Sequence, residues 1–519
     1  MHGRKVPEAG DPAGGLKTDR TAMKRPSVLK TLIALAASLA ASAAWPQQPF
    51  DLDPTFRTEI DAINVNDVLP LPGGDIMISG QIRFPGEMYA KGYARLSPTG
   101  ERVLPFPDFT PGGGWMIPWG VEQFYVQNGI GMRLINFDGS IDTAFSMITR
   151  PYYHNLLCAD AHIYPDGSML VGGWQLLTDT ARGFVGEYGF VWFSNQGYLD
   201  TTRTHRRTGE AVQTMKLVQD GKFLCSGGGG MVEGMPCSTI FRVDADAVLD
   251  TTFNAPYLQF GVGYDYKPLA EGKILAGGYF RFLGSTDTLS LVRFLSDGQV
   301  DPTFHTPYCE VNYNSSSFPI VSQITPLGSD RYIITGNFNR VDGQVRGGIA
   351  LLDTAGNLLD DFFTGSGCDG FLWPLWPPGL EIYHRSILGI HPLPDGSYYL
   401  YGAYHGYDDG TTNDTLQRMV SRLYGLDVGI HEPAAGGLHP LVIAPNPSAG
   451  STVLYVEKPL GQGVLTVHDA SGRVVLSEGW PAGTRTHTLR AGALAPGSYL
   501  LHVQEEQGAI YSGKLILLP

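Results

Sequence analysis

The sequence predicts an all-β protein: a seven-bladed β-propeller with four-stranded blades, followed by a small Ig-like β-sandwich. Two repeated patterns and the composition lead to this. Gly-x-x-Asp-x-x-Phe recurs between residues 50 and 363, and pairs of glycines six residues apart recur between its copies. The 519 residues include 67 Gly and 36 Pro but only 17% charged residues, which is typical of turn-rich β structure.

The repeat has seven copies, about 39 to 59 residues apart, a period that indicates a propeller, solenoid or array. The clearest copies run from Gly139 to Phe145 and from Gly298 to Phe304. Asp200 keeps only the acid, and Phe106 keeps only the aromatic ring because Val103 replaces the acid. The other copies keep both residues: Asp53/Phe56, Asp250/Phe253 and Asp360/Phe363.

The glycine pairs divide each unit into strands. The first glycine lies in a turn such as Pro165-Asp-Gly167, which is a hairpin signal, and the residues between the two glycines are mostly apolar. A second apolar strand and another Gly turn follow, and a short strand ends in Asp-x-x-Phe. Four antiparallel strands of this kind make a propeller blade. The pairs are Gly74/Gly80, Gly167/Gly173, Gly221/Gly227, Gly272/Gly278 and Gly396/Gly402.

The ends of the array predict how it closes. Asp53-x-x-Phe56 has no strands of its own before it, and the last unit ends at Leu423 without a copy after it. We therefore expect the N-terminal segment, residues 50–56, to complete the last blade and give seven blades. Residues 107–138 lack a recognisable first hairpin, so a six-bladed ring or an open array remains an alternative.

Residues 50–425 resemble the delta-60 repeat family, with the best match from Glu271 to Phe304. The resemblance implies the propeller fold and no particular chemistry. The repeated acids could form a ring that binds calcium or a cationic group. Alternatively, each Asp accepts backbone N–H bonds while each Phe packs between blades. Recurrence in every unit favours the structural interpretation, and we expect no metal and no cofactor.

Residues 1–44 are predicted to be an N-terminal extension and a secretory signal peptide, with Met23 as the start and an apolar run from Thr31 to Ala41. That run is too short to cross a bilayer, and no other segment is a transmembrane candidate. The net charge of −14 argues against nucleic acid and anionic lipid as partners. Export permits disulfides. Cys225 and Cys237 flank one hairpin and could pair, or they could be free buried thiols.

The C-terminal part begins after a linker at residues 426–440 and has a different pattern over 441–519. This region resembles the type A sorting domain of the type IX secretion system. The resemblance implies a Bacteroidetes-type bacterium, passage across the outer membrane, and the secretion machinery and its sortase as partners. An ordinary Ig-like adhesion domain is the alternative. The resemblance rests on Asn446, Pro447, Asp469, Gly472, Arg473, Gly497, Tyr499 and Lys514.

Ligand binding would use the loops that break the repeat spacing. Aromatic side chains in these loops could stack on sugar rings, although packing under long loops also explains them. Within the predicted propeller, residues 45–425, the candidate ligand-binding residues are Trp115, Trp119, Tyr152, Tyr257, Tyr308, Trp373 and Trp376.

No catalytic motif of the common hydrolase, metalloprotease or nucleotide-binding types is present. Asp408 and Asp409 are adjacent, so in a strand they point to opposite faces and cannot act as a pair. The sequence therefore predicts a non-enzymatic binding or adhesion module, secreted or at the cell surface, whose partner is a glycan or another surface protein. The alternatives are a polysaccharide-active hydrolase or lyase that uses loop-face acids, and a structural component of the envelope.

Overall fold

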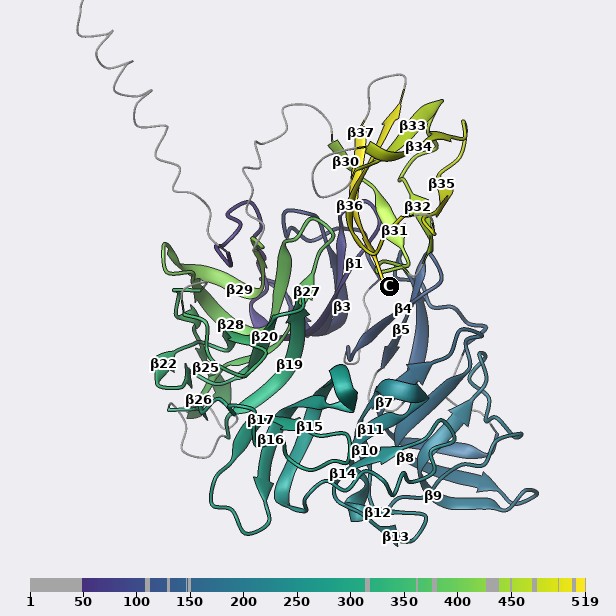
Figure 1. Ribbon diagram of the computed structural model, residues 1–519, viewed down its shortest axis with the longest axis vertical. Coiled ribbons are helices and arrows are strands. Elements are labelled where there is room, and N and C mark those ends of the chain that lie inside the picture. Colours follow the sequence, from purple (N-terminus) through teal and green to yellow (C-terminus); the bar gives the residue numbers. More distant parts are fainter. Residues whose placement is uncertain are drawn as a thin grey trace, which may run out of the picture. The chain divides into compact units, whose positions relative to one another are not determined.

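The structure is a computed structural model, shown in Figure 1. It describes residues 49–107, 113–127, 131–145, 147, 151–312, 318–360, 363–375, 380–425, 438–448, 450–468, 474–492, 494–505 and 510–518. Secondary structure in these ranges consists of strands and three short 3-10 turns, η1 (Gln219–Gly221), η2 (Gly228–Gly230) and η3 (Ala270–Gly272). No helix in this part of the chain has the length and apolar character needed to cross a membrane. The predicted all-β class is confirmed.

Seven antiparallel sheets follow one another along residues 62–423, each with three strands in sequence order. The stretch without a recognisable hairpin, residues 107–138, also holds one of them. The sheets are β1 (Ala62–Pro70), β2 (Ile76–Arg83) and β3 (Lys91–Leu96); β4 (Met116–Trp119), β5 (Gln123–Gln127) and β6 (Met132–Asn136); β7 (Tyr153–Ile163), β8 (Met169–Asp179) and β9 (Phe184–Phe193); β10 (Val212–Leu217), β11 (Phe223–Gly227) and β14 (Ile240–Val243); β15 (Leu258–Pro268), β16 (Ile274–Phe282) and β17 (Leu289–Phe294); β19 (Ile320–Leu327), β20 (Arg331–Asn337) and β23 (Ile349–Asp353); β27 (Ser386–Pro392), β28 (Tyr398–Asp408) and β29 (Asn413–Leu423).

The expected fourth strand is reduced to a single bridge. For example, the segment that follows β17 pairs with this strand through a single bridge, between Phe294 and Val300. The repeat explains this, because only two residues separate Gly298 of the turn from Asp301, which leaves the sheet. Corresponding bridges are Leu96–Arg102, Ile135–Ile141, Phe193–Leu199, Val243–Leu249 and Leu352–Leu358.

Short strands occur in the connections. β24 (Gly367–Cys368) extends the last sheet by pairing with β28. The others form small sheets of their own: β12 (Met231–Val232) with β13 (Met235–Pro236); β18 (Cys309–Glu310) with β21 (Arg340–Val341) and β22 (Gln344–Val345); and β25 (Phe371–Leu375) with β26 (Leu380–His384).

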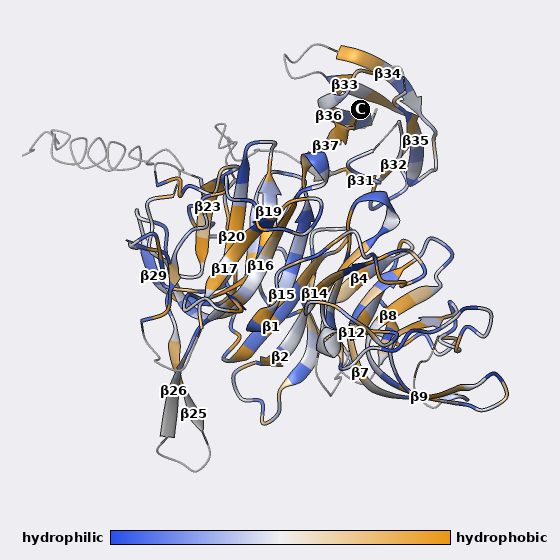
Figure 2. Ribbon diagram, turned by 60° about the horizontal axis from the view of Figure 1, so that its bottom comes forward, coloured by the Kyte–Doolittle hydropathy of each residue, from blue (hydrophilic) through white to orange (hydrophobic). Residues whose placement is uncertain are grey.

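The strands form sheets buried on both faces. Ile76, Met77 and Ile78 of β2 are all fully buried, so consecutive side chains on opposite faces both lack contact with water. Figure 2 shows apolar residues in the central strands, for example along β20. The turn between the first two strands uses a glycine with positive φ, such as Gly167 at +82°, a conformation that costs other residues energy. Because both faces of each sheet are apolar and buried, each sheet needs a neighbouring sheet against either face.

Six pairs of sheets meet through their first strands. β1 contacts β4, β7 contacts β10, and β10 contacts β15; β15 contacts β19, β19 contacts β27, and β27 contacts β1. The last contact joins the end of the series to its beginning. One hydrophobic cluster contains Ile78 of β2 together with Tyr399 and Tyr401 of β28.

The N-terminal segment pairs with the last sheet, which confirms the prediction for residues 50–56. Leu52 forms a bridge with Leu423, the Phe50 N–H donates to the Tyr424 carbonyl at 2.9 Å, and the Asp53 N–H donates to the Arg422 carbonyl at 2.9 Å. Phe56 is fully buried and its ring lies 5.2 Å from that of Tyr399.

The C-terminal part contains two sheets around one core. The five-stranded sheet has the order β30 (Leu438–Pro440), β37 (Ile510–Leu517), β36 (Gly497–Glu505), β33 (Gly463–His468), β34 (Val474–Trp480). The three-stranded sheet has the order β31 (Val442–Ala444), β32 (Ser451–Tyr455), β35 (Thr486–Arg490). Leu454 and Leu489 of the smaller sheet share a cluster with Leu465, Leu501 and Leu515 of the larger one.

Truncating Phe56 should weaken closure of the series. We expect Phe56→Ala to destabilise the protein by about 3–5 kcal/mol, because it empties a fully buried site between the first and last sheets. Exposed Glu59, three residues away, provides the control, and Glu59→Ala should stay within about 0.5 kcal/mol of the wild type. Urea denaturation followed by tryptophan fluorescence measures both. Equal losses would contradict the closure.

Candidate functional site

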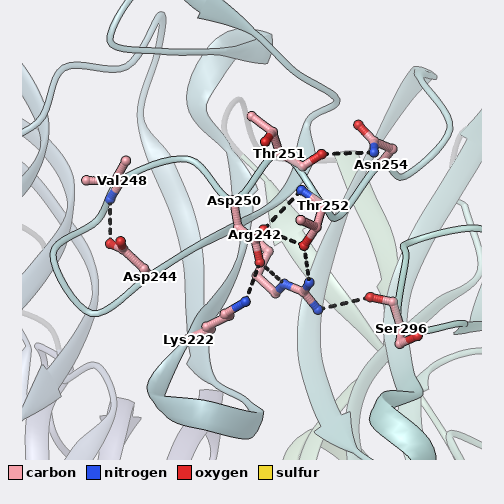
Figure 3. A network of polar contacts seen from close by, with 9 residues as sticks. All are labelled: Lys222, Arg242, Asp244, Val248, Asp250, Thr251, Thr252, Asn254 and Ser296. Atoms are coloured by element: carbon pink, nitrogen blue, oxygen red, sulfur yellow. Dashed lines mark hydrogen bonds and ion pairs between the residues drawn. The ribbon is translucent and has the colours of Figure 1, made fainter.

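Figure 3 shows what one repeated acid does. Asp250 Oδ2 accepts hydrogen bonds from Arg242 Nε at 2.7 Å and Lys222 Nζ at 2.8 Å. Its Oδ1 accepts from the backbone N–H of Thr252 at 3.0 Å and from the Thr252 hydroxyl at 2.6 Å. Burial opposes ionisation, but the bonds from Lys222, Thr252 and Arg242 outweigh it and hold the pKa of Asp250 well below its usual range. Both carboxylate oxygens are already engaged.

The next sheet repeats the arrangement around Asp301. Its Oδ2 accepts from Arg293 at 2.8 Å and lies 3.3 Å from Lys273 Nζ, while Oδ1 accepts from the Thr303 N–H at 2.9 Å. The same bonds lower the pKa of Asp301 despite the opposing effect of burial. Asp250 and Asp301 therefore accept backbone N–H bonds, as the structural interpretation predicted, and each additionally holds an Arg and a Lys.

The arginines connect each unit to the next. The Arg242 guanidinium lies 4.8 Å from the centre of the Phe253 ring and donates to the Ser296 carbonyl at 3.1 Å, in the turn of the following unit. Arg293 repeats this with Phe304 at 4.8 Å and the Thr354 carbonyl at 3.0 Å. These contacts explain why Asp and Phe recur together.

The repeated glycine receives the Phe segment of the preceding unit. A Cβ added at Gly356 would lie 1.9 Å from the His305 carbonyl oxygen and 2.9 Å from the Phe304 ring. At Gly298 it would lie 2.8 Å from the backbone nitrogens of Asn254 and Ala255. Both glycines have positive φ as well, +96° and +91°. The three parts of the motif thus belong to one contact between consecutive units.

Units that depart from the motif adjust locally. Where Val103 replaces the acid, Arg95 donates instead to Asp75 at 2.7 Å. Beside Asp200, Arg203 replaces the aromatic ring and lies 5.6 Å from the ring centre of Trp192. Across the described residues, no group of three or more His, Cys, Asp and Glu side chains could hold a metal ion. The ring of repeated acids is a frame in which each acid has its own protein partners.

A second polar network, which the sequence did not predict, lies on the first strands. β1, β7 and β15 each have a bulge just before an aspartate: Asp67, Asp160 and Asp265. Each carboxylate accepts a backbone N–H from the first strand of a neighbouring sheet, from Met116 at 2.8 Å, Met215 at 3.0 Å and Ile324 at 2.8 Å respectively.

Asp67 also joins the first sheet to the last. Burial raises its pKa to about 6, against the lowering effect of bonds from the Met116 and Val68 N–H groups and the Tyr401 hydroxyl of β28. Lys216 forms an ion pair with Asp160 at 2.9 Å and also lies near enough to Asp67 to lower its pKa. These charged groups serve contacts between sheets.

The predicted ligand-binding aromatics are spread over the structure. Trp115, Tyr152, Tyr257 and Tyr308 are exposed, but they precede strands of different sheets, β4, β7, β15 and β18. Trp119 is half-buried, with its ring 5.7 Å from Tyr125. The backbone of Trp373 pairs with Ile382 in the β25–β26 hairpin, and Trp376 lies outside the described residues. The four exposed residues therefore belong to the connections before different strands, and the use of these aromatics in ligand binding stays a prediction.

A different set of aromatic rings does come together. Phe318 lies 5.1 Å from Phe260 and 5.9 Å from Tyr279, and Tyr279 lies 6.2 Å from Tyr264. We call Phe260, Tyr264, Tyr279 and Phe318 the four-ring cluster. Tyr257, one of the predicted residues, belongs to the same β15–β16 hairpin, where its carbonyl accepts from the Leu283 N–H at 2.8 Å.

A hollow of about 420 Å³ lies between the turns of the fifth and sixth sheets. Its charged lining includes Lys273 and Arg293, whose partner is Asp301. The turns η3 and Gly328–Ser329 supply much of the remaining wall. Its basic groups therefore already belong to the frame.

The candidates for chemistry are engaged or buried. Asp408 accepts from the Ser366 hydroxyl at 2.6 Å, and Asp409 accepts from the Leu52 N–H at 3.1 Å. Burial lowers the pKa of His405 to about 4, and its ring stacks on Phe371 at 4.1 Å. All five cysteines are free thiols, so Cys225 and Cys237 are unbridged in this structure. Burial raises the pKa of Cys237 to about 11, which disfavours its nucleophilic thiolate.

The described residues of the C-terminal motif fix the ends of that domain. Asn446 Nδ2 donates to the Lys514 carbonyl at 2.7 Å, and its Oδ1 accepts from the Ile516 N–H at 2.8 Å. Pro447 follows Asn446 by a cis peptide bond. The Tyr499 hydroxyl, two residues after Gly497, donates to the Ala495 carbonyl at 2.6 Å. Asp469, Gly472 and Arg473 lie outside the described residues.

Comparison of the sequence with protein families agrees with both parts. Residues 442–518 match the family described as "Secretion system C-terminal sorting domain". Residues 270–304 match the family described as "Domain of unknown function (DUF5122) beta-propeller". A sorting domain of the type IX system implies export to the cell surface or secretion, and both predicted resemblances are confirmed.

Solved structures give weak likenesses. The extracellular domain of a putative one component system from B. thetaiotaomicron has 11% identity and a TM-score of 0.18, covering 90% of this chain and 82% of that one. The extracellular domain of a putative hybrid two component system from the same organism has 10% identity and a TM-score of 0.22, covering 89% and 92%. Regucalcin, a calcium-binding protein from Agrobacterium tumefaciens, has 12% identity and a TM-score of 0.27, covering 56% and 86%. No curated protein matches the sequence.

Removing one repeated acid should leave two partly buried basic groups without their shared carboxylate. We expect Asp301→Ala to destabilise the protein by about 2–3 kcal/mol, because Arg293 and Lys273 lose their shared partner. Asp200 makes the same turn bonds, to the N–H and hydroxyl of Thr202, and serves as the matched control. Asp200→Ala should cost about 1 kcal/mol. Urea denaturation compares them, and calcium or a chelator should not change either midpoint. Equal losses, or a calcium-dependent midpoint, would contradict the structural role.

Asp67 should make stability depend on pH in a defined direction. Its folded pKa of about 6 lies above the ordinary value of 3.8, so the folded state binds the proton more tightly and stability falls as pH rises between those values. The stability of Asp67→Asn relative to wild type should therefore increase by about 1–2 kcal/mol from pH 4 to pH 7, allowing for partial solvent contact. Thermal unfolding at several pH values measures this, with exposed Glu101→Gln as control. A constant difference between Asp67→Asn and wild type would refute it.

Proposed function

We propose that the protein is an exported, non-enzymatic binding or adhesion module. In this proposal the seven sheets are the blades of a closed seven-bladed propeller over residues 45–425, and residues 426–440 link it to an Ig-like sandwich at 441–519. The contact of β27 with β1 and the pairing of Leu52 with Leu423 support closure. The propeller presents the ligand surface.

Delivery follows from the C-terminal domain. We propose that a signal peptide in residues 1–44 directs the chain through the inner membrane, and that residues 441–519 engage the type IX secretion machinery and its sortase at the outer membrane. The match of residues 442–518 to the sorting family supports this route.

One observation carries the binding role: the acids that could do chemistry serve the frame, while aromatic rings remain in contact with solvent. Asp250 and Asp301 hold basic groups and backbone N–H groups, and Asp408 and Asp409 fix loops. A glycosidase needs two carboxyl groups free to face one sugar ring. Exposed aromatic rings instead suit binding to a glycan or a surface protein.

A glycan array with the chain from residue 45 onward tests the proposal. We expect binding to at least one glycan class, with no change in the mass or reducing ends of the bound sugar over a long incubation. Binding to an isolated surface protein without glycan binding would also support a binding module. Release of shortened products would contradict the non-enzymatic role, and neither binding nor turnover would contradict the function as a whole.

A further inference from the structure

We propose that the four-ring cluster is a binding site for uncharged glycans, in which a pyranose ring stacks on its aromatic surface. This rests on the proposed binding function and names its ligand class and its place. The site is assembled from three segments: β15 contributes Phe260 and Tyr264, β16 contributes Tyr279, and the segment before β19 contributes Phe318.

The rings form one continuous aromatic surface. Phe318 lies centrally, 5.1 Å from Phe260 and 5.9 Å from Tyr279, whose ring plane is within 3° of its own. Tyr264 extends the series beyond Tyr279 at 6.2 Å, and Phe260 lies 6.5 Å from Tyr279. Four rings at these separations make contact with their neighbours and orient one another.

The cluster is not required as core. Phe318 is 42% exposed and Tyr264 is 36% exposed, whereas Tyr266, two residues further along β15, is 2% exposed. Rings left in water contribute little of the stabilisation that burial gives. Phe260 and Tyr279 are half-buried beside them, so the exposed part of the cluster is the kind of contiguous apolar patch that marks interaction sites.

The bulge in β15 explains how Tyr264 reaches this surface. The register shifts between Gly263 and Asp265, so Tyr264 is the extra residue without a partner on β16. Asp265, the next residue, is held by the Tyr266 and Ile324 N–H groups. A bulge changes the direction of the side chain at the extra residue. The bond from the Ile324 N–H of β19 to Asp265 holds the residue next to this bulge, and it therefore also fixes the position of Tyr264.

The chemistry of the surface favours a sugar. The face of an aromatic ring carries negative charge, which attracts the C–H groups on one face of a pyranose. The two tyrosine hydroxyls can hydrogen-bond sugar hydroxyls at the edge. The guanidinium of Arg281 lies over the Phe260 ring, 4.7 Å from its centre, and donates to the Thr288 hydroxyl. The cluster itself contains rings only, whereas peptide-binding grooves use apolar anchors inserted into pockets. The net charge of −14 disfavours acidic sugars.

Four neutral hexasaccharides probe the site: cello-, laminari-, xylo- and mannohexaose, titrated calorimetrically into the chain from residue 45 onward. We expect at least one to bind, and Tyr279→Ala and Phe318→Ala to weaken it at least about tenfold. Tyr279→Phe keeps the ring and should retain most of the affinity. Tyr89→Ala, at a ring 73% exposed on another connection, is the matched control and should bind like the wild type. Thermal unfolding checks that all variants fold.

The outcomes separate this site from the proposed function. If a hexasaccharide binds wild type, Tyr279→Ala and Phe318→Ala equally, the four-ring cluster is not the site, although the protein remains a binding module. If only acidic glycans or proteins bind, the ligand class is wrong. If nothing binds on the array or in these titrations, both the cluster and the binding function fail.

Discussion

The contact between consecutive units is the constraint on which the rest of this structure depends. An aspartate holds an arginine, the arginine covers a phenylalanine and donates to the next turn, and a glycine in that turn leaves room for the phenylalanine. Burying charge is unfavourable unless all its hydrogen-bonding groups are satisfied. Asp301 meets that condition, because both of its carboxylate oxygens have partners. The charged contact can therefore fix the position of one unit against the next more closely than apolar packing alone.

This constraint explains why the repeat carries no catalytic information. An acid that already accepts from Arg, Lys and a backbone N–H has no proton to exchange near neutral pH, and the pKa of Asp250 is shifted away from that range. On the first strands, Asp160 and Asp265 each accept a backbone N–H from a neighbouring sheet, so these carboxylates also serve contacts between sheets. These acids therefore belong to the frame of the structure.

The sequence predicted those features that depend on local chemistry. Gly turns, Asp-x-Thr hydrogen bonds and the pairing of residues 50–56 with the last strand all follow from short motifs and their order. The fourth strands are shorter than expected, because the turn glycine and the acid leave only two residues between them. The bulges before Asp67 and Asp265 could not be predicted, since their acceptor bonds are made to other sheets. The C-terminal domain was predictable from its motif, whose described residues fix its ends.

The four-ring cluster was missed for a related reason. Phe260, Tyr279 and Phe318 are widely spaced in sequence, and nothing local distinguishes exposed Tyr264 from buried Tyr266 in the same strand. Tyr264 and Tyr266 both lie in β15, which pairs with β16. The propeller family matches residues 270–304, which begin at the turn after β15 and include Lys273, Arg293 and their partner Asp301. The turn end of β15 and β16 is fixed by contact with the next unit. Phe260 and Phe318 take no part in that contact, so substitutions at these two positions would leave the contact between units intact. Recognition in this fold should therefore be sought where the strands leave the frame.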